Sequence, residues 1–559
     1  MRISARASLL CLGLVVAPPA SSASQDWPEA GAAAQALVEA GRDPALARPI
    51  RTADLPALKA LYGADPRSLF WFDGASPRRT VEGCLETLAR ADVSGLEPAD
   101  YDAATLAALF AAMKGNPRPS PTEAAQFDVG LSAAFMRLLG DVHQGRVDPR
   151  SVAFDIDVSG KRLDLEAVLR SARDGAGGCA AAFAAAEPPF EVYRRLVQTL
   201  ARYRSLAARG EPPLVPALEG KVKKIEPGQP WAGPIPLDAR LRALGDLPAD
   251  AAAPSTAPDG TSVYDGAVVE GLKRYQDRHA LDPDGVIGPA TIVALNTPFT
   301  VRVHQIELAL ERLRWLPQLP DRRLIFVNIP LFTLWALEPD QPENNFRMRV
   351  VTGKSAGHAT PIFIDDMEYV IFRPYWNPPP SINRNEILPH ARRDPAYLDK
   401  QNMEIVASGA TDAPALPATE ENLALVAKGK LTLRQRPGGK NSLGLVKFIF
   451  PNTNNVYMHG TPSQKLFSRA RRDFSHGCIR LEDPARLAEW VLRDDPAWTR
   501  ARIEQAMAGN RPLQVNLKTP IPVVIFYDTV LVDADGIAHF SDDYYKHDAR
   551  LDEALHERR

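Results

Sequence analysis

The sequence predicts a multidomain α+β fold: a helical scaffold, a small three-helix domain, and a mainly β domain of the β-sandwich type with an inserted lid. Its 559 residues suffice for several domains, each with its own core. Apolar residues follow helical spacing in the N-terminal part and form short strand-like runs in the C-terminal part. Fifty prolines indicate many loops and linkers between these parts.

The N-terminus has the pattern of an export signal. Arg2 and Arg6 form a basic N-terminal region. The apolar run that follows, at residues 9–17, is too short to span a bilayer. Small residues follow, so we predict cleavage after Ala23 and a signal peptide at residues 1–23. The alternative is an uncleaved signal that anchors the chain in the inner membrane. We expect a periplasmic protein with no stable membrane span after cleavage.

Export changes the interpretation of the cysteines. Without the signal the chain keeps Cys84, Cys179 and Cys478. An oxidising compartment favours pairing of two of them, and Cys84 and Cys179 share the N-terminal helical region. We expect these two to form a disulfide or to stay buried as thiols, which leaves Cys478 free.

Residues 45–210 are predicted to form a helical scaffold domain. Leu131, Phe135, Leu138 and Val142 recur at helical spacing and give one apolar face. The region contains no cluster of residues with catalytic chemistry, so a packing role is expected. The proline-rich stretch that follows, residues 211–234, is predicted to be a linker.

A compact unit of three short helices is predicted at residues 235–298. A turn-rich loop with the sequence Asp-Pro-Asp-Gly-Val-Ile-Gly, residues 282–288, precedes the third helix. With Leu244-Gly245-Asp246 and Tyr275-Gln276, this loop resembles the peptidoglycan-binding domain of the three-helix type. The resemblance implies binding to the cell wall but places no groove residues. The alternative is an inert spacer.

The rest of the chain is predicted to be mainly β. A connecting helix at residues 299–320 leads into a domain at residues 321–535, and a tail follows at residues 536–559. Polar, helical and proline-broken sequence at residues 381–439, with little strand pattern, indicates an inserted lid. The predicted strands are residues 324–329, 347–351, 367–372, 447–450, 456–458 and 523–527.

One thiol and two imidazoles come together in the motifs His459-Gly460-Thr461 and Ser475-His476-Gly477-Cys478-Ile479-Arg480. The strand at residues 456–458 would place His459 at its end, and the 18 residues between His459 and Cys478 can form a loop that returns beside it. An imidazole beside a thiol lowers the pKa of the thiol and gives a thiolate–imidazolium pair. Gly477 allows close backbone approach, so nearby N–H groups can hold an oxyanion.

The cluster has two other interpretations. His459, His476 and Cys478 are all possible zinc ligands, but the sequence has no spaced fourth ligand and no glutamate base of the known zinc patterns. Cys478 could also be a buried structural cysteine. The upstream histidine favours nucleophilic catalysis, with Cys478 attacking and His459 as the base. We therefore expect no metal and no cofactor.

The two motifs resemble the active-site signature of the L,D-transpeptidase catalytic domain. Flanking stretches and the domain order resemble the large periplasmic murein L,D-transpeptidases with an N-terminal scaffold. Two details depart from that pattern: Gly460 stands where Asp is common, and residues 378–380 are all proline. The first departure limits any role at position 460 to the backbone. The stretches that carry the resemblance are residues 375–378, 381–382, 434–438, 441–444, 447–448, 450–452, 461–462 and 466–467.

The resemblance implies a role for each residue of the site. Cys478 is the nucleophile, and His459 is the general base, oriented by the Gly460 carbonyl. The backbone N–H groups of Gly477 and Cys478, with His476 near them, form the oxyanion hole. Four further residues have open roles: Arg480 holds a substrate carboxylate or forms a structural ion pair, Tyr457 and Trp376 line the acyl-donor cleft or belong to the core, and Ser475 bonds within the loop.

The implied reaction acts on peptidoglycan stem peptides. The thiolate attacks the carbonyl at the L-centre of diaminopimelate in a tetrapeptide stem, D-Ala leaves, and a thioester forms on Cys478. The side-chain amine of another stem then attacks and links two diaminopimelate residues. Carbapenems would acylate the same thiol. The alternatives are an L,D-carboxypeptidase, an enzyme that attaches a protein to the wall, and a catalytically inactive wall-binding protein. Other cell-wall synthases are possible partners.

Charge argues against one class of partner. The formal net charge is −2, and no basic stripe with interleaved aromatic residues is present. Nucleic-acid binding depends on a clustered positive surface. We therefore expect no nucleic-acid partner.

Overall fold

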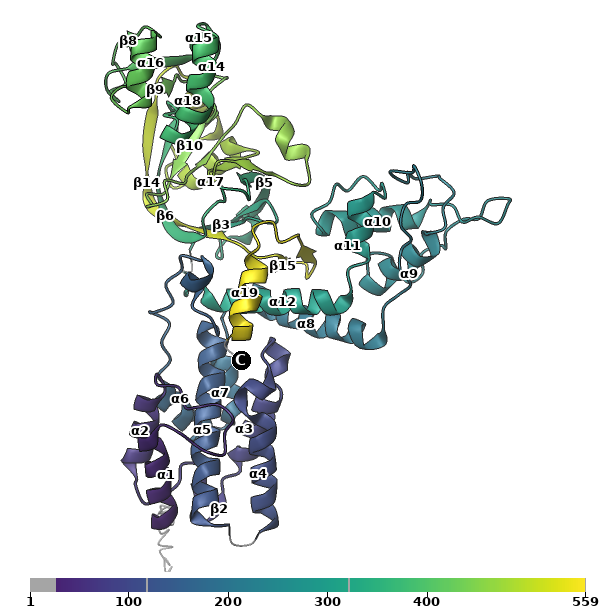
Figure 1. The fold of residues 1–559 in the computed structure, drawn as a ribbon, viewed down its shortest axis with the longest axis vertical. Helices are drawn as coiled ribbons and strands as arrows, with labels where there is room; N and C mark the ends of the chain where they lie inside the picture. Colours follow the sequence, from purple (N-terminus) through teal and green to yellow (C-terminus); the bar gives the residue numbers. More distant parts are fainter. Residues whose placement is uncertain (1–26, 117–118, 320–321, 558–559) are drawn as a thin grey trace, which may run out of the picture. The chain divides into compact units, whose positions relative to one another are not determined.

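The computed structural model describes residues 27–116, 119–319 and 322–557 (Figure 1). The predicted signal peptide, residues 1–23, lies outside them. The chain divides into two compact units. One comprises Met1–Arg90, Pro98–Leu139 and Asp164–Ala185, and the other comprises Ala91–Glu97, Gly140–Leu163 and Ala186–Arg559.

The first unit is helical, in agreement with the predicted scaffold. Leu131, Phe135 and Leu138 lie on α5 and are fully buried, as the helical spacing of these residues predicts. The Asp128 carboxylate, also on α5 and buried, accepts hydrogen bonds from the N–H groups of Phe70 and Trp71 at 3.0 and 2.7 Å. The helices are α1 (Pro28–Ala40), α2 (Leu55–Ala64), α3 (Thr80–Ala89), α4 (Ala103–Gly115), α5 (Pro121–Gln144), α6 (Leu165–Asp174) and α7 (Gly178–Ala186).

A disulfide joins two helices of this unit. Cys84 on α3 and Cys179 on α7 are bonded, and both side chains are buried. Of the two states expected for these residues, the structure shows the disulfide. Cys478 is a free thiol.

In the second unit, helices lie on both sides of the stretch predicted to be a linker: α8 precedes it and α9 follows it. Helix α9 is capped by Gly245, whose φ of +81° is in the left-handed region that glycine adopts without strain. The Gln276 side chain holds the turn after α10: its amide donates to the Val286 carbonyl, and its oxygen accepts from the Gly285 N–H, both at 2.9 Å. These motif residues therefore build the fold. The helices are α8 (Glu191–Arg209), α9 (Pro234–Leu244), α10 (Ala267–Arg278), α11 (Pro289–Leu295) and α12 (Phe299–Trp315).

The β domain is one sheet that closes on itself, so the predicted β-sandwich is wrong. Among the described residues, eight strands follow the order β5-β13-β11-β10-β6-β14-β3-β4 and return to β5, and β12 adds to β5. Closure occurs because β5 pairs with β4 through residues 346–349 and with β13 through Val350 and Val351. The strands are β3 (Leu324–Asn328), β4 (Thr333–Leu337), β5 (Phe346–Gly353), β6 (Phe363–Phe372), β10 (Val446–Ile449), β11 (Met458–His459), β12 (Asp473–Ser475), β13 (Ile479–Leu481) and β14 (Leu513–Phe526).

The insertion after β6 is a small folded element with its own core. Its apolar core includes Ile387, Leu398, Ile405 and Leu433. It contains the three-stranded sheet β8-β7-β9. The sequence predicted little strand structure here because these strands are short. Its elements are α13 (Pro380–Ile382), a π-helix (Asn383–Ile387), α14 (Leu388–Arg393), α15 (Tyr397–Lys400), β7 (Met403–Val406), β8 (Ala415–Leu416), α16 (Glu420–Ala427) and β9 (Thr432–Gln435).

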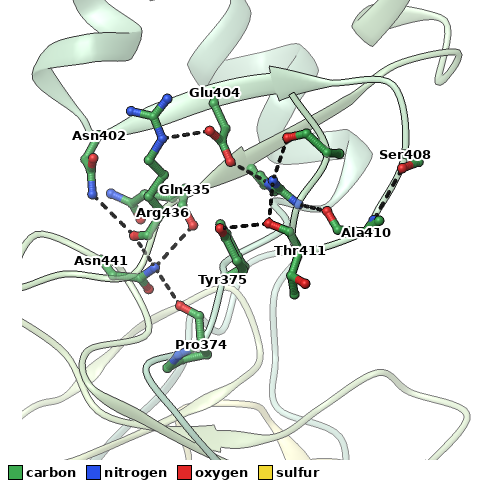
Figure 2. Close-up of polar contacts among 12 residues, drawn as sticks. Pro374, Tyr375, Asn402, Glu404, Ser408, Ala410, Thr411, Gln435, Arg436 and Asn441 are labelled. Carbon is green, nitrogen blue, oxygen red and sulfur yellow. Dashed lines mark hydrogen bonds and ion pairs between the residues drawn. The ribbon is translucent and has the colours of Figure 1, made fainter. Parts of the chain in front are cut away.

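Ion pairs and hydrogen bonds fix the base of this insertion (Figure 2). The buried Glu404 carboxylate accepts from Arg434 Nε and Arg436 Nε, both at 2.7 Å. The Arg434 guanidinium lies 4.2 Å from the centre of the Tyr375 ring. The Asn441 amide donates to the Pro374 and Arg436 carbonyls at 3.1 and 3.0 Å. Both chain connections of the insertion are thus tied together by charged and polar contacts.

The C-terminal residues complete the second unit. Helices α17 (Pro484–Leu492) and α18 (Arg500–Ala508) precede β14, and β15 (Val530–Val532), β16 (Ala538–Phe540) and α19 (His547–Glu557) follow it. Residues 536–557, expected as a tail, therefore include folded elements. The Tyr545 hydroxyl, just before α19, donates to the Gly353 carbonyl at the end of β5 at 2.5 Å. In the described part of the chain, none of the helices combines the length and apolar character needed to cross a membrane.

Candidate active site

The two sequence motifs meet because β11 and β13 are parallel neighbours. Met458 pairs with Ile479 and His459 with Arg480, while the Ile479 N–H donates to the Tyr457 carbonyl at 3.1 Å. Met458 and Ile479 are fully buried and belong to the apolar core. Since side chains alternate along a strand, those of Tyr457, His459, Cys478 and Arg480 project from the opposite, outer face. The imidazole at the end of β11 and the thiol of the residue just before β13 therefore share one face.

The His459 ring is held in one tautomer. Its Nδ1 lies 2.5 Å from the Gly460 carbonyl oxygen, which can only accept a hydrogen bond. Nδ1 therefore carries the proton, so Nε2 is the unprotonated nitrogen of the neutral ring. A side chain at position 460 would take no part in this contact, and an added Cβ there would come within 3.3 Å of Pro484.

The surroundings of both reacting groups favour their neutral forms. Burial and the nearby positive charge of Arg480 lower the pKa of His459 to about 3. Burial raises the pKa of the Cys478 thiol, against the opposing effects of the Tyr457 N–H, Lys447, the Tyr457 hydroxyl and Arg480. This environment differs from the thiolate–imidazolium pair expected from the sequence, because burial disfavours both charges.

The loop before Cys478 is shaped by Ser475 and Gly477. The Ser475 hydroxyl donates to the Cys478 carbonyl at 2.6 Å and accepts from the Gly477 N–H at 3.1 Å. Gly477 has φ +114°, which L-residues rarely adopt, so the glycine is needed for its backbone conformation rather than for space. The Gly477 N–H is thus occupied, whereas the Cys478 N–H has no partner among the described residues. Of the two expected oxyanion donors, Cys478 N–H is the one available in this structure.

Thr360 is a buried residue of the site that the sequence analysis missed. Its hydroxyl donates to the Gly477 carbonyl and accepts from the Gly353 N–H, both at 2.8 Å. It thereby links the end of β5 to the active-site loop. A lone threonine outside every motif and 117 residues before Gly477 gave no signal in the sequence.

Replacing Thr360 with Val should destabilise the second unit by about 1–3 kcal/mol, because it leaves a buried carbonyl and a buried N–H without a partner. Urea denaturation followed by hydrogen exchange in the second unit measures this loss. Thr360→Ser, which keeps the hydroxyl, is the matched control and should retain most of the stability. Equal losses in both variants would mean that the methyl group, and not the two hydrogen bonds, stabilises the loop.

His476 contacts the insertion. Its Nε2 lies 2.9 Å from a Glu386 carboxylate oxygen, and its ring packs edge-on against His358 at 4.5 Å. Glu386 belongs to the π-helix, a rare element that is frequent at functional sites. Burial lowers the pKa of His476, although Glu386 opposes this effect. Through His476, the insertion therefore contacts the active-site loop.

The remaining candidate residues lie in different surroundings. Trp376 is half-buried and packs against the core of the insertion, and its backbone pairs with that of Gln435. The Cys478 Sγ lies 4.0 Å from the Asn455 carbonyl oxygen, and the Tyr457 ring lies 5.7 Å from the His459 ring, centre to centre. Arg480 has no acidic partner among the described residues, and its Nε is buried without a hydrogen bond. The structural ion pair considered for Arg480 is thus not present in the described part of the chain.

The described residues include no cluster of three or more His, Cys, Asp or Glu side chains placed to hold a metal ion. The zinc interpretation required His459, His476 and Cys478 to converge on one ion. In the structure His459 Nδ1 is bonded to a carbonyl and His476 to Glu386.

Comparisons with known proteins match three parts of the chain. The model of the L,D-transpeptidase catalytic domain matches residues 322–523, that of the scaffold domain matches residues 56–200, and that described as "Putative peptidoglycan binding domain" matches residues 235–295.

A curated protein and a solved structure also match parts of the chain. A "Putative L,D-transpeptidase" of Haemophilus influenzae is 28% identical over 241 residues, which are 43% of this chain and 47% of the relative. The chain thus spans about half the length of the curated relative it matches. The crystal structure of an L,D-transpeptidase (residues 123–326) from Xylanimonas cellulosilytica aligns with 55% of this chain and 100% of its own at 13% identity, with a TM-score of 0.17 that supports no structural conclusion.

The catalytic-domain match contains both strands that hold His459 and Cys478, and the two other matches lie before it in the chain. The chain therefore carries a scaffold domain, a peptidoglycan-binding domain and an L,D-transpeptidase catalytic domain, in that order.

Proposed function

We propose that this protein is a periplasmic cysteine L,D-transpeptidase that makes diaminopimelate–diaminopimelate crosslinks in peptidoglycan. The observation that carries the proposal is the placement of Cys478 and His459 on one face of adjacent parallel strands, with His459 Nδ1 bonded to the Gly460 carbonyl. The catalytic-domain match supports the reaction class, and the peptidoglycan-binding match supports the substrate.

The acylation step needs one proton transfer into the imidazole and one out. His459 Nε2 takes the thiol proton as Cys478 Sγ attacks the carbonyl at the L-centre of diaminopimelate. The Cys478 N–H stabilises the oxyanion of the tetrahedral intermediate. As the C–N bond breaks, the imidazolium returns its proton to the departing amine of D-Ala, and a thioester remains. Arg480, which has no acid partner in the described chain, is suited to hold a substrate carboxylate.

The second step transfers the acyl group to an amine. The side-chain amine of another stem attacks the thioester, His459 removes the proton of that amine, and Cys478 leaves as a thiol. No cofactor is needed because the thioester conserves the energy of the cleaved peptide bond. Carbapenems would acylate the same sulfur. Water as the acceptor would give an L,D-carboxypeptidase, and a protein amine would give an attachment enzyme.

The reaction can be tested with purified protein and muropeptides that carry tetrapeptide stems. Mass spectrometry should find dimers that have lost one D-Ala, and no product with Cys478→Ala. Tripeptide products alone would favour the carboxypeptidase. Full activity of Cys478→Ala would exclude Cys478 as the nucleophile. Fractionation of cells should recover the protein in the periplasm, and recovery with the inner membrane would favour an uncleaved signal.

Removing the insertion should change acceptor use, because Glu386 contacts the residue that begins the Gly477–Cys478 loop. Trp376 and Gln435 form a mutual backbone pair at 3.1 and 2.7 Å, so an Asn-Gly turn can replace residues 377–434 with little strain. The ratio of dimer to tripeptide in the muropeptide assay is expected to fall, since water then reaches the thioester. An unchanged ratio in a folded variant that still alkylates at Cys478 would refute a gating role.

A further inference from the structure

Lys447 is a charged residue beside the proposed active site that the reaction steps above do not use. It lies on β10 and pairs across the sheet with His459, which in turn pairs with Arg480 on β13. The three side chains therefore form one row on the outer face, with a cation on each side of the imidazole. The ammonium group of Lys447 lies 3.6 Å from the centre of the Tyr457 ring, and the positive charges of Lys447 and Arg480 both act on the Cys478 thiol.

Neither cation of this row has an acidic partner among the described residues. Elsewhere in the second unit, several buried arginines are paired with acids: Arg278 with Asp246, Arg312 with Asp548, and Arg434 with Glu404. Buried Arg472 instead donates to the Val350 and Phe332 carbonyls, a type of contact that Arg480 Nε lacks. Lys447 and Arg480 are both partly buried, and Arg480 Nε makes no hydrogen bond. Two unpaired cations in a partly desolvated site are costly unless an anion binds there.

We propose that Lys447, together with Arg480, forms a carboxylate subsite beside Cys478 and selects acyl donors that carry a carboxylate close to the scissile bond. The tetrapeptide donor fits this chemistry, because the leaving D-Ala bears its carboxylate on the carbon next to the scissile nitrogen. The inference rests on the proposed function and deepens it: Lys447 determines donor specificity. A donor whose last residue is amidated would lose the contact.

A positive charge at this place could instead serve only to stabilise the Cys478 thiolate. Two alkylating reagents separate the two roles. Iodoacetate and iodoacetamide both react with the thiolate, so the ratio of their rates at one pH does not depend on the thiolate fraction. The ratio reports how strongly the site attracts a carboxylate placed next to the sulfur. Cys84 and Cys179 are disulfide-bonded, so peptide mapping without reductant follows Cys478 alone.

The experiment compares the exported wild-type protein with Lys447→Met, Lys447→Gln and Lys447→Arg. Removing one charge near the reacting carboxylate should lower the iodoacetate-to-iodoacetamide rate ratio by about 5- to 50-fold, whereas Lys447→Arg should keep most of it. Lys465→Met, at an exposed position of the same domain, is the matched control and should leave the ratio unchanged. The preference for tetrapeptide acid over tetrapeptide amide in kcat/KM should fall in parallel with the rate ratio.

Two results would overturn the inference. One is an unchanged rate ratio in both Lys447→Met and Lys447→Gln, including the case where only the pH midpoint of alkylation shifts. The other is an equal loss in Lys447→Arg, which would point to shape and not to charge. The alkylation assay needs no transpeptidation, so a failed muropeptide assay with a normal rate ratio would count against the proposed function alone.

Discussion

Replacing His459 with Gln should lower the rate of Cys478 acylation by about 10²- to 10⁴-fold, the usual contribution of a positioned base. The amide can still approach the Gly460 carbonyl but cannot take the thiol proton. Because burial raises the pKa of Cys478, little thiolate exists at neutral pH to compensate for the missing base. Mass spectrometry of the acyl-enzyme, formed with a carbapenem or a tetrapeptide donor, measures the rate.

The pH dependence of the same reaction tests the state of His459. With a pKa lowered to about 3, the imidazole stays almost wholly unprotonated at pH 5 and above, so acylation should not fall between pH 7 and pH 5. An ordinary histidine, with pKa near 6.5, would lose most of its base form over that range. His556→Gln, at an exposed position on α19, is the control and should leave rate and profile unchanged. A rate loss centred near pH 6.5 in the wild type would contradict the neutral buried imidazole.

Replacing both Cys84 and Cys179 with Ala should lower the free energy of unfolding of the first unit by about 2–5 kcal/mol. The disulfide closes a loop over a sequence separation of 95, which restricts the unfolded chain, and both residues are buried in the folded unit. Urea denaturation with hydrogen exchange at α3 and α7 measures the change.

Reductant gives the internal check on this prediction. Wild-type protein in reductant should approach the stability of the double variant, while the double variant should not respond to reductant. Cys478→Ala, which removes a free and partly exposed thiol, should leave the first unit unchanged. A double variant as stable as the wild type would show that packing of α3 and α7, and not the bond, holds these helices.

The local spacing of apolar residues predicted the helical regions and several strands. The spacing of the two active-site motifs predicted that they lie side by side. Closure of the sheet could not be predicted, because it depends on β5 using both of its edges. Strand β14 was predicted only in its last residues, since Gln514, Asn516 and Lys518 face solvent and break the apolar run. The strand extends back to Leu513 because residues 513–516 also pair with β6, after an irregularity between Asn516 and Ile521.

Within the site, the sequence indicated residue types but not their connections. Gly477 was expected for close approach, yet its positive φ is the reason for glycine. The sequence did not indicate that Thr360 and Lys447 lie near the site. Thr360 contacts the active-site loop, and the sheet register places Lys447 beside His459. The charge states of Cys478 and His459 depend on burial, which motif spacing does not report.

The raised pKa of Cys478 also affects how readily its thiol is oxidised in an oxidising environment. Oxidants and other disulfides react with a thiolate far faster than with a thiol, and the first product of oxidation by peroxide is a sulfenic acid. A partly exposed cysteine with a raised pKa is therefore shielded from sulfenylation and from mixed disulfides until a donor engages it. The same burial that makes His459 necessary as a base thus acts as antioxidant protection for the sulfur.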